Sequence, residues 1–147
     1  MNADVRRLSQ TLTEAEYLEM WICLPNHNES SHAVVSRPAN DYRLDLYCGD
    51  SLNATITGSY LVCHQRKMLL SWCRTSAANP ATSFVDIRLR GDFGNSTLEL
   101  EHTGLSSAAE YFWQMAMWRT SLEKLVDLMR NSRPGPRFGE GLRETLR

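Results

Sequence analysis

Apolar and polar residues alternate along the middle of the chain. In residues 83–90, for example, Val85, Ile87 and Leu89 alternate with charged side chains. Because successive side chains of a strand point to opposite faces, this pattern predicts strands with one buried and one polar face. Gly58 interrupts one such segment and predicts a bulge or a sharp bend. Segments of this kind predict an antiparallel sheet and lie at 42–48, 53–64, 68–74, 83–90 and 96–102.

The spacing of apolar residues becomes helical after the last of these strands. Tyr111, Met115, Trp118 and Leu122 recur at intervals of three and four, and the same spacing continues beyond them. This places them on one face and predicts a single long amphipathic helix over 106–131.

The residues before the first predicted strand have a weaker helical pattern. Residues 3–24 predict one or two short helices, with Thr13 or Ser9 as the cap of the first. Pro25 and the polar residues that follow it predict a loop to about residue 40.

The order of elements predicts an α+β protein in which a curved antiparallel sheet of five to six strands wraps around the long helix. We expect one domain over 1–131. Residues 132–147 are rich in proline, glycine and arginine, and we expect a mobile tail with a helical turn at 141–147. The tail arginines predict a solvated segment and not a nucleic-acid patch; they are Arg133, Arg137, Arg143 and Arg147.

Composition is ordinary for a globular protein, with 147 residues, 42% of them hydrophobic. The net charge of −1 gives no electrostatic reason to expect nucleic acid or an anionic membrane as a partner. No apolar run approaches the roughly 20 residues of a membrane span. The N-terminal residues lack the apolar segment of a secretory signal, so we expect a cytoplasmic protein.

Metal and cofactor sites have little support in the sequence, and we expect none. The cysteines show no zinc-module spacing and are expected to be reduced thiols packed as small hydrophobes; they are Cys23, Cys48, Cys63 and Cys73. His27, Glu29 and His32 form a polar cluster, but a loop does not preorganise metal ligands.

His102 is the strongest candidate for acid–base chemistry. Glu101 precedes it, but adjacent strand residues point to opposite faces, so Glu101 is poorly placed to orient the imidazole. We therefore expect His102 to have a structural role at the turn into Thr103 and Gly104, and we assign no catalytic residue.

A cavity between the sheet and the long helix is the candidate binding site. Its expected wall is apolar and comprises Ile56, Tyr60, Met68, Leu70, Trp72, Val85 and Ile87 from the strands and Phe112, Met115, Trp118 and Leu122 from the helix. Arg43 and Asp45 share one strand face. Pointing inward they would orient a polar group of a ligand, and pointing outward they would form a solvated pair. Periodicity does not distinguish a lined cavity from a filled core.

Five segments, in this order, resemble a known family. They are TLTEAEYLEMWICLP, YRLDLYCGD, GSYLVCHQRKMLLSW, STLELEHTGL and MAMWRTSLEKLVDLM, the last with Trp118 at the position of a hallmark tryptophan. The order resembles the helix-grip fold of the START/Bet v 1 superfamily, and most closely the C-terminal domain of the activator of Hsp90 ATPase. The resemblance covers about residues 8–131. It implies a protein that binds a hydrophobic small molecule, with a cyclase/aromatase or hydrolase enzyme, or an Hsp90-type regulator, as alternatives.

The chain departs from this family at two points. Members usually have a strand before the first helix, which pairs beside the last strand, whereas this chain begins at the helix. Without that strand the edge of 96–102 would be unpaired, which predicts a homodimer through this strand or protection by the tail, unless the start site is assigned too late. Asp50 stands where a second glycine is common, so the geometry of that turn is open.

Overall fold

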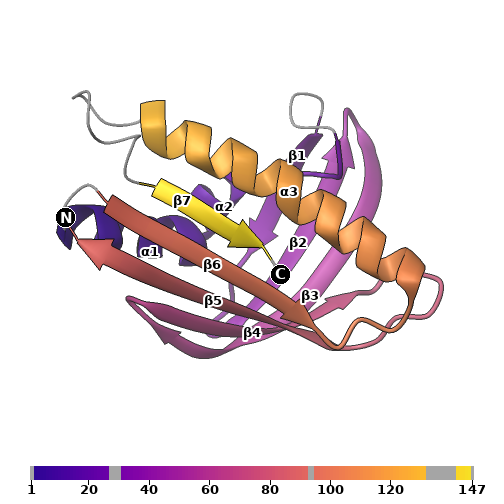
Figure 1. Cartoon of the computed structure of the whole chain (residues 1–147). Helices are drawn as coiled ribbons and strands as arrows, with labels where there is room; N and C mark the ends of the chain where they lie inside the picture. Colours follow the sequence, from indigo (N-terminus) through magenta and orange to yellow (C-terminus); the bar gives the residue numbers. More distant parts are fainter. Residues whose placement is uncertain (1, 27–30, 93–94, 132–141, 147) are drawn as a thin grey trace.

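One curled sheet of seven strands dominates the described structure (Figure 1). The computed structural model describes residues 2–26, 31–92, 95–131 and 142–146. Neighbouring strands in the sheet follow the order of the sequence, and all pairs are antiparallel except the last, which is parallel. The strands are β1 (Ser31–Ser36), β2 (Asp41–Cys48), β3 (Ser51–His64), β4 (Lys67–Arg74), β5 (Ser83–Asp92), β6 (Asn95–Thr103) and β7 (Leu142–Leu146).

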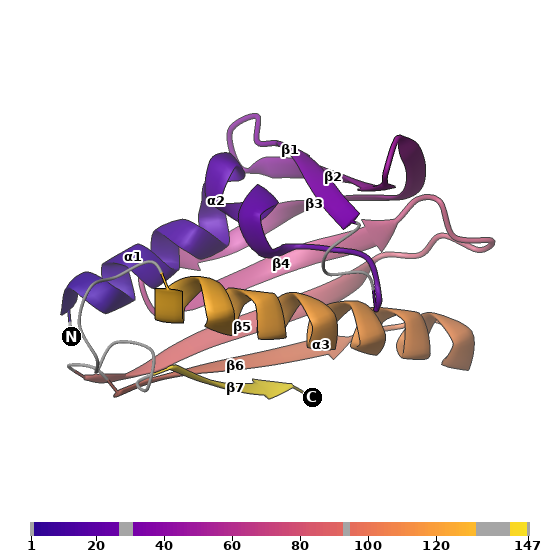
Figure 2. The same cartoon turned by 90° about the horizontal axis from the view of Figure 1, so that it is seen from above.

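Three helices accompany the sheet in the described part of the chain: α1 (Asn2–Thr13), α2 (Ala15–Trp21) and α3 (Ala108–Asn131). The long helix α3 runs across the hollow side of the curl, and α1 and α2 lie beside it (Figures 1 and 2). Thr13 ends α1 and Ser9 lies inside it. Neither residue caps its start, because the helix already begins at Asn2. No helix among the described residues has the length and apolar character needed to cross a membrane.

The five predicted strands are confirmed, with ends that differ by at most two residues. The reason is the simple alternation that the sequence shows. In β2, Tyr42, Leu44 and Leu46 are buried, whereas Arg43 is exposed. The fold is thus α+β, with a curled antiparallel sheet and a long C-terminal helix.

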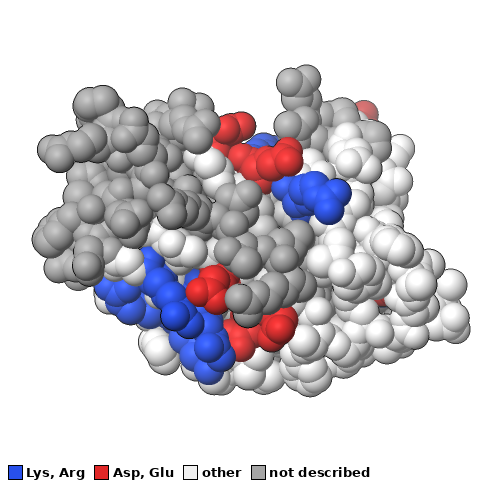
Figure 3. Space-filling model, viewed as in Figure 1, with Lys and Arg blue, Asp and Glu red and all other residues white. Residues whose placement is uncertain are grey.

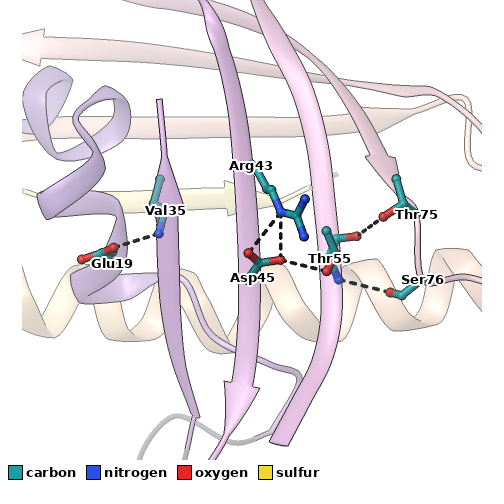
Figure 4. A network of polar contacts seen from close by, with 7 residues as sticks. All are labelled: Glu19, Val35, Arg43, Asp45, Thr55, Thr75 and Ser76. Carbon is teal, nitrogen blue, oxygen red and sulfur yellow. Dashed lines mark hydrogen bonds and ion pairs between the residues drawn. The ribbon is translucent and has the colours of Figure 1, made fainter. Parts of the chain in front are cut away.

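β1 corrects the loop predicted up to residue 40. Ala33 is buried and Val35 packs against the core, so the strand has an inner face although it is short. Its outer edge is partly covered, because the Val35 N–H donates to Glu19 Oε2 of α2 at 2.8 Å (Figure 4). The strand is only six residues long and polar residues precede it, which hides it from pattern analysis.

β7 corrects the helical turn predicted at 141–147. It pairs in parallel with β6, from Ser96 opposite Leu142 to Leu100 opposite Leu146. The chain's own C-terminal strand therefore covers the edge of β6 that the sequence predicted to be open. Of the two predicted alternatives, the structure shows protection by the tail. The edge of β6 that suggested a homodimer is paired with β7 over Ser96–Leu100. Residues 132–141 and 147, with Arg133, Arg137 and Arg147, lie outside the described residues.

The Tyr42 side chain of β2 reaches across β3 at Gly58. Its hydroxyl donates to the main-chain carbonyl of Ser71 on β4, over Gly58. A Cβ atom at Gly58 would lie 1.9 Å from the Ser71 oxygen and 2.6 Å from the Tyr42 hydroxyl oxygen. The predicted bulge occurs between Tyr60 and Val62 instead. Glycine is required at position 58 because the main chain of Ser71 and the side chain of Tyr42 approach it closely.

Candidate functional site

The residues predicted to line a cavity pack against one another in the space between sheet and α3. All the predicted strand residues of this wall are buried, as are Met115, Trp118 and Leu122 of α3. The rings of Trp72 and Trp118 lie 4.9 Å apart, and Tyr42 joins this cluster beside Trp72 and Tyr60. These side chains belong to one buried hydrophobic core.

Phe112 does not belong to this wall, and its assignment there was wrong. Its side chain is 69% exposed, and Tyr111 beside it is also exposed. Both lie in the first turns of α3, and the buried face of the helix runs instead through Gln114, Trp118, Ser121 and Leu125. Residues two apart in a helix lie on nearly opposite faces, so Phe112 points away from the sheet when Gln114 points toward it.

Arg43 and Asp45 form the solvated pair of the two alternatives. Arg43 Nε lies 3.1 Å from Asp45 Oδ2, and the Arg43 side chain is 58% exposed. Asp45 also accepts a hydrogen bond from Thr55 Oγ1 at 2.9 Å, and contacts from Thr55 continue to Thr75 and Ser76 (Figure 4). This network lies on the face of the sheet opposite the core, so the inward interpretation of Arg43 and Asp45 is wrong.

His102 is a buried polar residue inside the aromatic cluster. Its Nδ1 accepts a hydrogen bond from the Trp118 indole N–H at 3.0 Å, and its Nε2 lies 2.7 Å from Ser83 Oγ. Because Nδ1 accepts, the neutral ring carries its proton on Nε2 and donates to Ser83. Burial lowers the pKa of His102 to about 4, against an opposing influence from Glu110. The imidazole is therefore neutral near pH 7.

This geometry does not prepare Ser83 as a nucleophile. The Ser83 hydroxyl donates to the main-chain carbonyl of Trp72 at 3.0 Å while it accepts from His102. A general base would have to accept the serine proton, which is the reverse of this direction. Ser83 is also buried. The pair connects β4, β5 and β6, and the structural role predicted for His102 fits these contacts.

A line of polar contacts leads from Trp72 to the surface. The Trp72 indole N–H donates to Gln114 Oε1 at 3.2 Å, and Gln114 Nε2 donates to Glu110 Oε2 at 2.8 Å. Glu110 then pairs with Arg74 through two hydrogen bonds, Nε to Oε2 at 3.0 Å and Nη2 to Oε1 at 2.7 Å. The hydrogen bond from Arg74 is the main reason why the pKa of Glu110 is lowered.

The line ends in a small cleft at the start of α3. Arg74, Ser83, Leu105, Glu110 and Gln114 line it, together with residues of the β4–β5 loop. Its free volume of about 10 Å³ is about the size needed for one water molecule.

The surroundings of the cleft carry few charges. Residues 75–84 and 103–109, which form the loops next to it and the adjoining ends of β5, β6 and α3, contain no Asp, Glu, Lys or Arg. Tyr111 and Phe112 are exposed at this end of the molecule, with ring centroids 5.7 Å apart. Figure 3 shows this end, at the right of the view, as almost entirely uncharged, whereas charged side chains gather elsewhere on the same face. The cleft is thus a polar spot within a largely uncharged surface.

Arg74, Glu110 and Gln114 were not predicted from the sequence. Gln114 gave a usable signal in the sequence, because it is a polar residue on the same helix face as Trp118. In the structure it is 1% exposed. Arg74 and Glu110 are 36 residues apart, and no local pattern links them. Of the other candidates, His32 stacks on Tyr47 at 5.1 Å, and His27 and Glu29 lie outside the described residues. Among the described residues, no group of three or more His, Cys, Asp or Glu could hold a metal ion.

Comparison with known proteins supports the fold. The structure is similar to the crystal structure of protein CV1439 from Chromobacterium violaceum, with a TM-score of 0.65 and 17% sequence identity. The similarity covers 84% of this chain and 88% of that chain. No family model and no curated protein matches the sequence. At this identity the similarity concerns the arrangement of helices and strands alone.

Proposed function

We propose that this is a helix-grip protein that binds an apolar or aromatic small molecule between its sheet and α3, with the cleft at Arg74 and Glu110 as the opening. The line of polar contacts from the cleft to Trp72 carries this proposal. Polar groups inside an apolar core add little stability, whereas a few converging polar groups within apolar walls are typical of ligand sites.

The composition of the core supports a space that can accept a ligand. Four of the six methionines are buried there: Met68, Met115, Met117 and Met129. Methionine is unbranched and adapts its shape to different neighbours, which suits a core that must open for a ligand. A ligand would take the place of contacts that these side chains now make with one another.

An enzyme that uses the same space is the second possibility. Its chemistry would need a group other than the Ser83–His102 pair, because the Ser83 proton points to a main-chain carbonyl. A role as a regulator of Hsp90 rests on the sequence resemblance alone. Binding is therefore the function that the geometry favours.

Native mass spectrometry of the purified protein, with identification of the released small molecules, tests the proposal. In parallel, tryptophan fluorescence is followed during titration with a panel of apolar and aromatic compounds, since Trp72 and Trp118 lie in the proposed site. We expect a retained compound, or a saturable fluorescence change with at least one member of the panel. If the protein retains no compound and no member changes the fluorescence, the proposal is wrong.

A pair of variants locates the site. Met117→Phe fills space inside the core and should weaken binding about tenfold or more, while the protein remains folded by circular dichroism. Glu123→Gln lies on the exposed side of the same helix and should bind as the original protein does. Equal binding by both variants would place the ligand elsewhere.

A further inference from the structure

We propose that the natural ligand is a monocarboxylic acid with an apolar or aromatic body, and that its carboxylate replaces Glu110 on Arg74. This inference rests on the proposed function and specifies the class of ligand. It follows from the geometry of the cleft, in which an arginine already holds a carboxylate through two parallel hydrogen bonds.

Arg74 is positioned independently of Glu110. Its guanidinium carbon lies 4.2 Å from the centre of the Trp113 ring, a contact that holds the cation over an aromatic face. The side chain is 18% exposed and extends from the last residue of β4. When Glu110 moves away, the guanidinium therefore remains in place with its paired donors facing the cleft. A planar guanidinium of this kind matches the two oxygens of a carboxylate.

Glu110 has a second position available to it. Ser107 precedes α3, and its hydroxyl accepts a hydrogen bond from the Glu110 main-chain N–H at 3.1 Å. This is one half of a capping box, in which the glutamate three residues after the cap also turns back to the N–H of the cap residue. The Glu110 carboxylate instead bonds to Arg74 and Gln114. Rotation of the Glu110 side chain alone would move its carboxylate from Arg74 to the main-chain N–H of Ser107.

The exchange preserves the charges of the cleft. Arg74 and Glu110 are both mostly buried, so loss of either partner without replacement would leave a buried charge unpaired. A ligand carboxylate restores the pair, whereas a neutral ligand does not. The start of a helix also favours an anion near Glu110 in both states.

The surroundings restrict the ligand to one acid group and an apolar body. Arg74 is the single cation among the described residues that line the cleft. A phosphate or a dicarboxylate would bring more negative charge than one arginine compensates. The neighbouring segments 75–84 and 103–109 contain no charged residue that could bind a second acid group.

Calorimetric titration with matched probes tests this inference. The probes are straight-chain and aryl-acetic carboxylic acids, decanoic acid and 2-naphthylacetic acid among them, each paired with its primary amide. We first free the purified protein of any retained compound. We then expect the acids to bind about tenfold tighter than the amides.

Three variants sharpen the test. Arg74→Gln should remove the preference for acid over amide, and Glu110→Gln should strengthen binding of the acids because Arg74 loses its competing carboxylate. Arg43→Gln removes an exposed arginine from the outer face and should leave both affinities unchanged. A purely structural role of Arg74 would change acids and amides alike.

The outcomes separate this inference from the proposed function. If acids and amides bind equally well and Arg74→Gln affects them equally, the ligand class is wrong and the binding function stands. If no acid binds to the original protein or to Glu110→Gln, the ligand class is again wrong. The retained compounds seen by native mass spectrometry then decide the binding function separately.

Discussion

The indole N–H of Trp118 points at Nδ1 of His102, 3.0 Å away, and so determines which nitrogen of the imidazole carries the proton. The proton must lie on Nε2, where it is donated to Ser83. A histidine that the sequence presents as a candidate base is therefore a buried, neutral connector between α3 and two strands. Protonation of Nδ1 would break the contact with Trp118, which has a measurable consequence for stability.

We predict that the protein loses stability in mild acid because of His102. Its pKa falls from 6.5 in the ordinary state to about 4 in the folded protein, so the unfolded chain binds a proton that the folded chain does not. This contribution is complete above about pH 6.5 and is lost as the pH falls toward 4, by about 3 kcal/mol in total. Urea unfolding at a series of pH values measures it.

The variant His102→Gln provides the control for this pH dependence. It removes the titrating group, so its free energy of unfolding should change less between about pH 6.5 and 5 than that of the original protein. This window lies above the ordinary pKa of Glu110, whose lowered value contributes only at more acidic pH. Equal slopes for the two proteins would show that His102 is not the responsible group.

Gly58→Ala should destabilise the protein strongly. The added Cβ would lie 1.9 Å from the Ser71 carbonyl oxygen, a main-chain atom that cannot move without shifting β4. We expect a loss of at least about 3 kcal/mol in the free energy of unfolding, measured by denaturant titration. Gly49→Ala is the matched control, since it meets no atom within 4 Å and adopts a positive φ. It should cost only about 1 kcal/mol, and an equal cost at both positions would contradict the close approach at Gly58.

Deletion of residues 142–147 should cause self-association. It removes β7 and leaves the edge of β6 without a neighbour over Ser96–Leu100. Light scattering coupled to size exclusion would show a concentration-dependent rise in mass for the truncated protein. Deletion of Arg147 alone leaves β7 whole and should not change the mass. A truncated protein that has the same mass as the full chain at all concentrations would show that β7 does not protect this edge.

Arg43→Ala should have almost no effect. The pair with Asp45 is exposed on the outer face of the sheet, where solvent weakens it. We expect the melting temperature to change little, corresponding to within about 0.5 kcal/mol, and ligand binding to be unaffected. A large loss of binding would instead return Arg43 to the site.

The sequence pattern predicted the apolar residues of the candidate site but not its polar ones. Alternation placed Trp72, Val85 and Ile87 in the core correctly, and the helical period did the same for Met115 and Trp118. It did not find the polar residues of the cleft, because Arg74 and Glu110 meet only through the packing of α3 against the end of β4. Phe112 was misplaced because it lies off the buried face of α3, close to the start of the helix.

Local periodicity by itself determined the predicted strands of the sheet, the long helix and the identity of most core residues. These are properties of near neighbours, since backbone geometry alone sets which side chains share a face. Only the tertiary structure decided that β7 covers β6, that Tyr42 reaches Ser71 over Gly58, and that Arg74 meets Glu110. Each of these depends on the curl of the sheet and the position of α3. Those are set by packing between segments far apart in the chain, which no local pattern records.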